Sequence, residues 1–279
     1  MKVVICKPDL DTCLTGLILG VGSQDEVAAV RGDSNPEDLS DPMVLCIEVG
    51  GSGQVDRYNF DHHETEVYLP PACRQACDYS GQRDERLGRL VEYVSMVDVN
   101  SKDHPPVPFP SLSNLFSGML FVEKGAVAQF HAGIIVLQAV LDRGFDPFAT
   151  LPVLPDWEPY ITAKLENQKR LAELISHAEY HTSRSGLQIG YSGHDAIGGI
   201  GALYQQGCQA AILLSEQFGD PAIRKFTIAG NRIPVGHLAP FFEKIEQGWG
   251  GTQTILGSPR DRDSRLSKDQ VLAIVKEHL

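Results

Sequence analysis

The chain has 279 residues and a mass of 30.5 kDa, enough for one large domain or two of ordinary size. An apolar content of 42% and a charged content of 22% are those of a globular protein, and no apolar run reaches the ~18 residues of a membrane span. A net charge of −12 argues against binding long nucleic acid, because an acidic surface repels phosphate unless a local basic groove compensates. The start, MKVVICKPDLD, does not resemble a signal peptide, and the six cysteines do not resemble a disulfide scaffold. We therefore expect a cytoplasmic protein with reduced thiols and no membrane contact.

Strand and helix signals alternate along the first third of the chain. The pattern predicts a helix at 13–22 and strands at four apolar runs, 3–6, 26–32, 43–51 and 57–63. Amphipathic spacing then predicts helices over 85–97 and 126–142. This alternation is typical of an α/β domain with a largely parallel sheet flanked by helices.

The proline-rich segment 145–159 predicts a linker or domain boundary, and a helix with Ile161, Leu165 and Ile175 on one side follows it. The last third predicts a smaller α/β unit, with strands at 187–192, 210–216, 224–230 and 252–258, helices near 197–207 and 236–246, and a closing helix. Ser267 and Gln270 form a capping box for that closing helix, with Leu266 and Val271 as its hydrophobic staple. We expect a first domain at 1–145, a linker and connecting helix at 146–185, a second domain at 186–279, and a cleft between the domains.

Acidic and imidazole side chains gather where the predicted strands of the first domain end. Asp9 and Asp11 come directly after the first strand, and residues two apart in an extended chain point the same way. Glu48 lies at the end of the run 43–51, and Asp98 lies at the end of the 85–97 helix. The run 57–63 ends in Asp61, His62 and His63. In an open α/β sheet, ligands bind at the carboxyl ends of the strands.

A divalent metal would resolve the repulsion between these carboxylates, and mixed carboxylate and imidazole ligands suit Mn²⁺, Mg²⁺ or Fe²⁺. Two metals about 3.5–4 Å apart would clamp a phosphoryl oxygen and generate hydroxide near neutral pH. Taken singly, each residue has a structural alternative. Asp11, for example, would serve as the N-cap of the 13–22 helix.

The motifs together resemble the DHH phosphoesterase family. NFDHHE after MVLCIEVGG, with DLDT near the start and MVDV further on, matches its pattern of a D-x-D, an acid closing a middle strand, the DHH triplet and a later aspartate. This family includes single-strand exonucleases, oligoribonucleases, exopolyphosphatases, family II pyrophosphatases and cyclic-dinucleotide phosphodiesterases. The resemblance implies an N-terminal DHH domain and a smaller C-terminal α/β domain that contacts the substrate.

The resemblance also implies a role for each residue of the constellation. One metal would be held by Asp9 and Glu48, and the second by Asp11, Glu48, His62 and Asp98. Mn²⁺ is the expected ion, with Mg²⁺ and Fe²⁺ as alternatives. His63 would face the substrate phosphate, and Asp61 would orient the neighbouring imidazoles. In the second domain, GWGGTQTILGSP resembles the family's glycine-rich signature, which assigns substrate contacts to Gly250, Gly251 and Thr252, with Arg232 nearby.

Three positions depart from the family pattern. Cys6 lies near where many members carry a histidine ligand, Glu48 replaces an aspartate, and Thr252 replaces the histidine of the glycine-rich signature. The sequence predicts a metal-dependent phosphohydrolase for a small phosphorylated substrate or a short single-stranded nucleic acid, such as an oligonucleotide, a cyclic dinucleotide or polyphosphate. The departures keep open a catalytically impaired member that binds nucleotide or nucleic acid without hydrolysis. A redox or metal sensor using Cys6, Cys13 and Cys46 is a third hypothesis, and a homodimer stays open.

Overall fold

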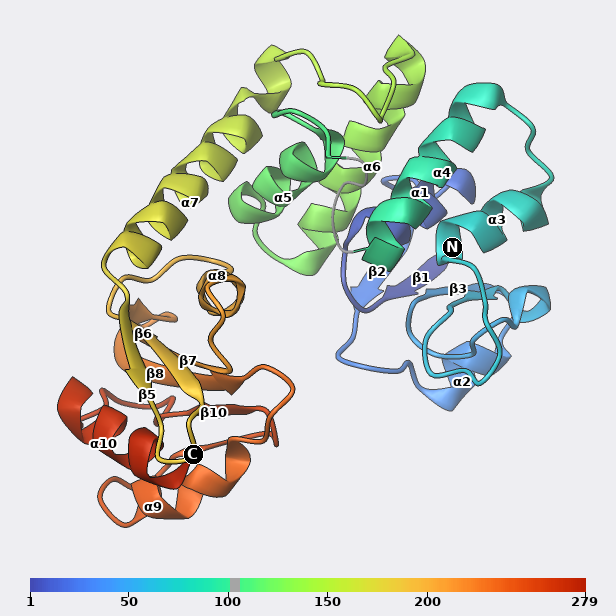
Figure 1. Ribbon diagram of the computed structural model, residues 1–279. Coiled ribbons are helices and arrows are strands. Elements are labelled where there is room, and N and C mark those ends of the chain that lie inside the picture. The colour runs from blue at the N-terminus through green and yellow to red at the C-terminus, as the bar shows by residue number, and fades with distance from the viewer. Residues whose placement is uncertain (101–105) are drawn as a thin grey trace. The chain divides into compact units, whose positions relative to one another are not determined.

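In the computed structural model, which describes residues 1–100 and 106–279, the chain divides into two units, Met1–Lys164 and Leu165–Leu279 (Figure 1). Each unit carries its own sheet, and the predicted mixed α/β fold is confirmed. The division falls within the long helix α7 (Glu158–Ser176), which lies in the segment expected to connect the domains. Within the described residues, no helix combines the length and apolar character needed to cross a membrane.

The first unit is built on a parallel sheet with the strand order β2-β1-β3-β4. The strands are β1 (Lys2–Ile5), β2 (Glu26–Ala29), β3 (Val44–Ile47) and β4 (Asn59–Phe60). Every pairing in this sheet is parallel, as the alternation of strands and helices predicts. The carboxyl ends of β1, β3 and β4 therefore lie at one edge, and this edge carries the acidic residues.

The two faces of this sheet differ in what covers them. Val3, Ile5, Leu45 and Ile47 belong to the large core of the unit, which includes residues of α1 (Leu10–Ile18), α3 (Ala72–Ser80), α4 (Glu85–Asn100), α5 (Leu112–Val122) and α6 (Ala126–Arg143). The alternate residues Val4, Val44 and Cys46 pack with Leu39 of the short helix α2 (Pro36–Ser40) on the other face. Figure 1 shows α1, α3 and α4 together on one side of this sheet, with α2 on the other.

The first helix begins earlier than the sequence pattern predicts. Asp9 is the N-cap of α1, where its side chain accepts a hydrogen bond from the Thr12 amide at 3.0 Å. The alternative that Asp11 caps this helix is therefore wrong, because Asp11 lies inside the first turn. The prediction that Asp9 and Asp11 point the same way because the chain is extended there is also wrong, since Asp11 is already helical.

The helices α3 and α5 have no counterpart in the sequence-based prediction. The helix α3 begins at Pro71 without a side-chain cap from its own segment. Its first amides, those of Ala72 and Cys73, instead donate to the carboxylate of Asp11, about sixty positions earlier in the chain. A cap supplied from such a distance leaves no local start signal in the sequence.

The second unit contains a mixed sheet with the order β5-β6-β7-β8-β10-β9, in which β6 and β7 are the parallel neighbours. The strands are β5 (Glu179–Thr182), β6 (Gln188–Ser192), β7 (Ala210–Phe218), β8 (Ile223–Gly230), β9 (Gly250–Gly251) and β10 (Ile255–Gly257). The helices are α8 (Gly199–Gln205), α9 (Ala239–Glu243) and α10 (Lys268–His278). The predicted capping box at Ser267 and Gln270 is present.

Within the first unit, α5 and the start of α7 approach each other at a glycine. A Cβ atom added to Gly118 would lie 1.9 Å from the carbonyl oxygen of Tyr160, so only glycine permits this contact. Close by, the Tyr160 hydroxyl donates to Glu123 Oε1 at 2.9 Å. Gly118 therefore fixes where the following turn of α7 lies relative to α5.

Gly118→Ala should destabilise the protein by roughly 1–3 kcal/mol, because the new methyl group overlaps backbone that cannot yield cheaply. The measurement is the free energy of unfolding in denaturant. Gly88→Ala in α4 is the matched control, since a Cβ there meets nothing within 4 Å and should raise helix stability by about 0.5–1 kcal/mol. Equal effects of the two substitutions would contradict the close contact.

Candidate metal centre

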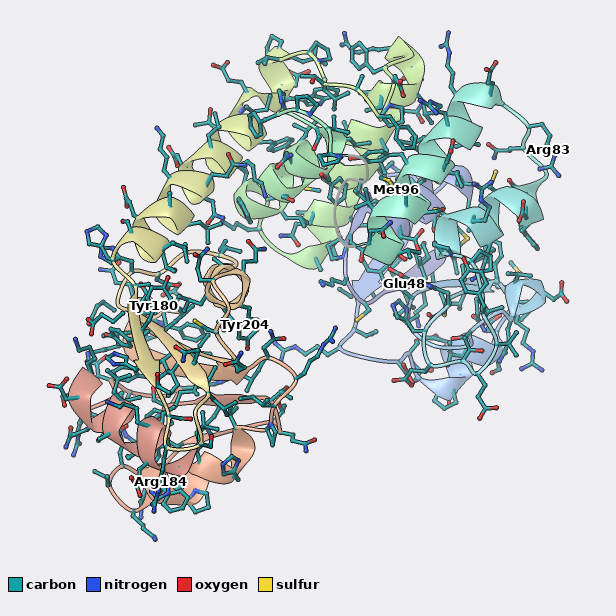
Figure 2. The ribbon with its side chains drawn as sticks, viewed as in Figure 1. Glu48, Arg83, Met96, Tyr180, Arg184 and Tyr204 are labelled. Carbon is teal, nitrogen blue, oxygen red and sulfur yellow. The ribbon has the colours of Figure 1, made fainter. Side chains whose placement is uncertain are left out.

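Four side chains of the first unit bring potential metal-ligand atoms within 4.8 Å of one another. They are Asp11 of α1, Glu48 after β3, His62 after β4 and Asp98 of α4. Figure 2 marks Glu48 and, on α4, Met96, which precedes Asp98 by two residues. The structure thus brings together four residues from separate parts of the chain, and all four were predicted from the sequence as metal ligands.

His62 lies at the centre of this cluster. Its Nε2 atom is 3.4 Å from Asp98 Oδ2, 3.5 Å from Glu48 Oε1 and 3.9 Å from Asp11 Oδ2. This buried nitrogen makes a hydrogen bond with none of the described residues, although three carboxylates surround it. A buried polar atom without a hydrogen bond is costly. An imidazole nitrogen facing several carboxylate oxygens is a donor set that fits a divalent cation.

Asp11 is held rigidly by the start of α3. Its Oδ2 accepts from the Ala72 amide at 2.7 Å and its Oδ1 from the Cys73 amide at 2.8 Å. The side chain is buried, and the positive end of the α3 dipole faces it. These bonds fix the carboxylate in one orientation while a second lone pair on each oxygen stays available.

Glu48 occupies the left-handed region of backbone space, with φ +53°. This conformation costs a non-glycine residue roughly 1–3 kcal/mol, and such residues cluster at functional sites. Its Oε2 accepts a hydrogen bond from the hydroxyl of Thr12, a buried residue of α1. Thr12 therefore aims this carboxylate while Oε1 faces His62.

Asp61 contacts His63 and the neighbouring loop. Its Oδ1 accepts from the His63 amide at 2.8 Å and lies 3.0 Å from His63 Nδ1, and its Oδ2 accepts from the Gly50 amide at 2.7 Å. The buried Asp61 carboxylate thus fixes the Nδ1–H tautomer of His63 and leaves Nε2 free to face a ligand. The His63 side chain is 59% exposed, and its ring centroid lies 4.3 Å from that of His62.

Two cavities of about 790 Å³ each meet at the cluster. Lys7, Asp9 and Asp98 line both cavities. Among the described residues, Glu48, His62 and His63 form a second group that could hold a metal, and Asp9 belongs to neither group. It lies beside them, however, because its carboxylate caps α1 two residues before Asp11.

Burial and the neighbouring charges raise the pKa of three acids at the site, Asp9, Asp11 and Asp98. Burial, reinforced by Glu48, raises the pKa of Asp9 to about 7 and that of Asp11 to about 6. Burial also raises the pKa of Asp98. The Glu48 carboxylate is the main cause that raises the pKa of His62 to about 9. Without a cation the site therefore retains protons that isolated side chains would release.

The cysteines of the sensor hypothesis lie in a different environment. Cys13 and Cys46 are buried, and burial raises the pKa of Cys46 to about 11 and that of Cys13 well above its usual value. A reactive thiol needs a lowered pKa, so these two side chains are poor redox sensors. Cys6 is partly buried and lines the cavity that contains His63.

The predicted substrate contacts of the second unit lie on two adjoining segments. Arg232 lies in the turn after β8 and has a φ of +59°. Just after this turn, the Val235 amide donates a hydrogen bond to the Gln253 carbonyl at 2.8 Å, which joins the two segments. Gly251 is required by the β9–β10 hairpin, because a Cβ there would lie 2.0 Å from the Ile255 carbonyl oxygen. Gly250 faces open space, and the Thr252 amide and hydroxyl close the same hairpin on Ile255. Their contact with a substrate stays a prediction.

Thr12 and the start of α3 are parts of the site that were not predicted from the sequence. Thr12 stands next to Asp11 in the DLDT motif, so its place one residue after a candidate ligand was the available signal. The amides of Ala72 and Cys73 carry no side-chain signal at all. Only tertiary structure shows that they hold Asp11.

Thr12→Val should weaken Mn²⁺ binding about 10- to 100-fold, because Glu48 loses the hydroxyl that orients it. The measurement is the Kd for Mn²⁺ by titration calorimetry. Thr15→Val is the matched control, since the buried Thr15 hydroxyl on the same helix has no hydrogen-bond partner among the described residues. A similar Kd for the two variants would argue against this role of Thr12.

Stabilisation by Mn²⁺ should grow as the pH rises from 5 to 8. The fold raises the pKa of Asp9 from 3.8 to about 7 and that of Asp11 from 3.8 to about 6. Because the folded state then binds more protons than the unfolded chain, the metal-free protein loses stability as the pH rises from 3.8 toward these values. His62, raised from 6.5 to about 9, adds a loss between those values. Metal ligation needs the deprotonated groups and removes the loss. The measurement is the difference in Tm between Mn²⁺-loaded and metal-free protein, and an increment as large at pH 5 as at pH 8 would contradict the account.

No protein-family model matches the sequence, and no curated protein matches it either. Solved structures are similar in fold. The pGpG-specific phosphodiesterase PggH of Vibrio cholerae is 15% identical, with 92% of each chain covered and a TM-score of 0.56. The DHH domain of a member of a ribosomal-protein family is 10% identical, covering 91% of this chain and 81% of that one, with a TM-score of 0.46. An exopolyphosphatase-related protein of Bacteroides fragilis is 12% identical, covering 98% and 90%, with a TM-score of 0.41. With its DHH triplet at the edge of a parallel sheet and a second α/β unit later in the chain, the protein has the two-domain fold of the DHH family.

Proposed function

We propose that the protein is a metal-dependent phosphohydrolase that acts on a small or short phosphorylated substrate. The observation that carries this proposal is the buried His62 Nε2, which lies within 3.9 Å of three carboxylates and makes no hydrogen bond with the described residues. The fold likeness to a phosphodiesterase supports it. A charge arrangement of this kind is unfavourable unless a cation joins it.

Asp11, Glu48, His62 and Asp98 would hold one divalent metal, for which Mn²⁺ is the first candidate and Mg²⁺ and Fe²⁺ are the alternatives. Asp9 and Glu48 would hold a second. When bound, such ions supply positive charge to a phosphoryl oxygen and lower the pKa of water. The protein contributes the orientation of its ligands, through Thr12 at Glu48 and through the α3 amides at Asp11.

His63 would contact the substrate phosphate. Asp61 accepts from the Nδ1 side of the ring, so Nε2 points away from Asp61 and offers either a hydrogen-bond donor or an acceptor, depending on protonation. A protonated His63 would donate to a phosphoryl oxygen and deliver a proton to the leaving oxygen. Asp61 acts here as a positioning residue, because it touches His63 and not the ligand.

A small or short substrate suits the chain better than long duplex nucleic acid. The net charge of −12 repels extended polyanions, and each cavity at the cluster has the size range of small-molecule sites. Short oligonucleotides, cyclic dinucleotides and polyphosphate are the substrate classes to compare. The alternative is a member that binds nucleotide without hydrolysis, and the departures at Cys6, Glu48 and Thr252 favour it.

Purified protein with Mn²⁺ should hydrolyse at least one of bis-p-nitrophenyl phosphate, a short oligoribonucleotide, a cyclic dinucleotide and polyphosphate. His62→Ala should lower kcat/KM by about 100-fold or more, because the central ligand is lost. His131→Ala, in α6 and outside the cluster, is the control and should leave turnover unchanged. Turnover that survives His62→Ala would refute the assigned centre, whereas nucleotide binding without any turnover in the native protein would establish the non-hydrolytic alternative.

A further inference from the structure

The two cavities at the cluster differ in charge. The cavity that contains His63, here the His63 cavity, is lined by the acidic residues Asp33, Glu64 and Glu66 in addition to Glu48 and Asp98 of the cluster. Lys7 is the lysine among its described lining residues. The other cavity, here the α5 cavity, extends from Asp9, Asp11 and Asp98 to α5 and to Lys164 of α7. An anionic ligand that reaches the metals is therefore repelled more strongly on the first side than on the second, where Lys164 adds a positive charge.

Lys164 is a half-buried cation in α7. It forms no ion pair with any of the described acidic residues, and its Nζ lies 5.7 Å from the centre of the Phe121 ring. Burial alone lowers the pKa of this lysine. Because a desolvated charge is unfavourable without a partner, an anion in the α5 cavity would gain from this ammonium group.

The position of Lys164 is fixed by the contact between α5 and α7. Gly118 admits the carbonyl of Tyr160, and Lys164 follows Tyr160 by four residues, which places it on the same face of α7 one turn further along. That face looks toward the later part of α5, where Phe121 lies beneath the ammonium group. The packing of two helices thus fixes this lysine in the lining of the cavity.

The remaining lining of the α5 cavity suits an organic phosphate. Val97, Phe116 and Leu120 supply apolar surface to the lining of this cavity. Asn114 and Ser117, from α5, supply polar atoms on the same wall. A cavity lined by candidate metal ligands, apolar side chains and a cation matches a ligand with a phosphate, an apolar body and a second anionic group.

We propose that Lys164 binds a second anionic group of the substrate, one that does not react, within the α5 cavity while the reacting phosphate lies at Asp11, Glu48, His62 and Asp98. This inference rests on the proposed function for the identity of the reacting group. It assigns the substrate body to the α5 side of the centre and makes Lys164 a residue that determines specificity. Inorganic phosphate, or a phosphodiester without a second anionic group, would not use the lysine.

Binding of a matched pair of ligands tests this inference without any need for turnover. The probes are a diadenosine dinucleotide whose bridging ester oxygen is replaced by methylene, prepared with and without a 5′ phosphate, and titrated in Mn²⁺. The native protein should bind the phosphorylated probe more tightly. Lys164→Gln should weaken that probe about 10- to 100-fold, as for loss of a charged hydrogen bond, and should leave the unphosphorylated probe unchanged. Lys164→Arg should retain most of the preference.

Lys169→Gln is the matched control, because Lys169 is an exposed lysine on the same helix, and it should change neither Kd. The inference would be overturned if Lys164→Gln weakened both probes equally or changed the binding of neither. It would also be overturned if the native protein did not bind the phosphorylated probe. Hydrolysis is scored separately with the natural dinucleotide. A native protein that prefers the phosphorylated probe through Lys164 yet cleaves no substrate would sustain this inference while refuting the proposed hydrolysis.

Discussion

The crowding of carboxylates around one imidazole is the constraint on which the rest of the first unit depends. Asp11, Glu48 and Asp98 lie within 3.9 Å of His62 Nε2, in surroundings that raise the pKa of Asp11 and Asp98. Like charges at such short range oppose folding unless protons or cations join them. The packing of the first unit nevertheless holds these carboxylates together, and hydrogen bonds fix the orientation of Asp11 and Glu48.

Three kinds of contact hold the side chains of the site. The start of α3 donates two backbone amides to Asp11, the hydroxyl of Thr12 holds Glu48, and the buried Asp61 orients His63. The first contact serves the fold as well, since Asp11 caps a helix that has no side-chain cap of its own. Glu48 adds a strained backbone, which packing around the end of β3 sustains. A site with ligands fixed in advance loses little freedom on binding a metal or a substrate.

The sequence allowed the candidate ligands to be predicted because the strand pattern and the motif order agree. The runs that become β1, β3 and β4 are followed by Asp9, Glu48 and Asp61, and parallel pairing brings their ends to one edge. The start of α1 was misplaced because the polar residues Asp11 and Thr12 interrupt the apolar run, although Leu10 packs in the same core as Leu14. The helix α3 and the role of Thr12 could not be predicted, since both depend on partners about sixty and thirty-six positions away. Lys164 was missed for a similar reason: its significance comes from Gly118 and the packing of α7 on α5.

The most direct test of the central claim is a crystal structure of the protein grown with Mn²⁺, with the anomalous signal measured at the manganese edge. We expect an anomalous peak within coordination distance of His62 Nε2 and of carboxylate oxygens from Asp11, Glu48 and Asp98. The carboxylate of Asp11 should keep its bonds to the α3 amides in that structure. A structure at neutral pH with no anomalous peak at His62, or with manganese bound only elsewhere, would contradict the claim that these residues form a metal centre.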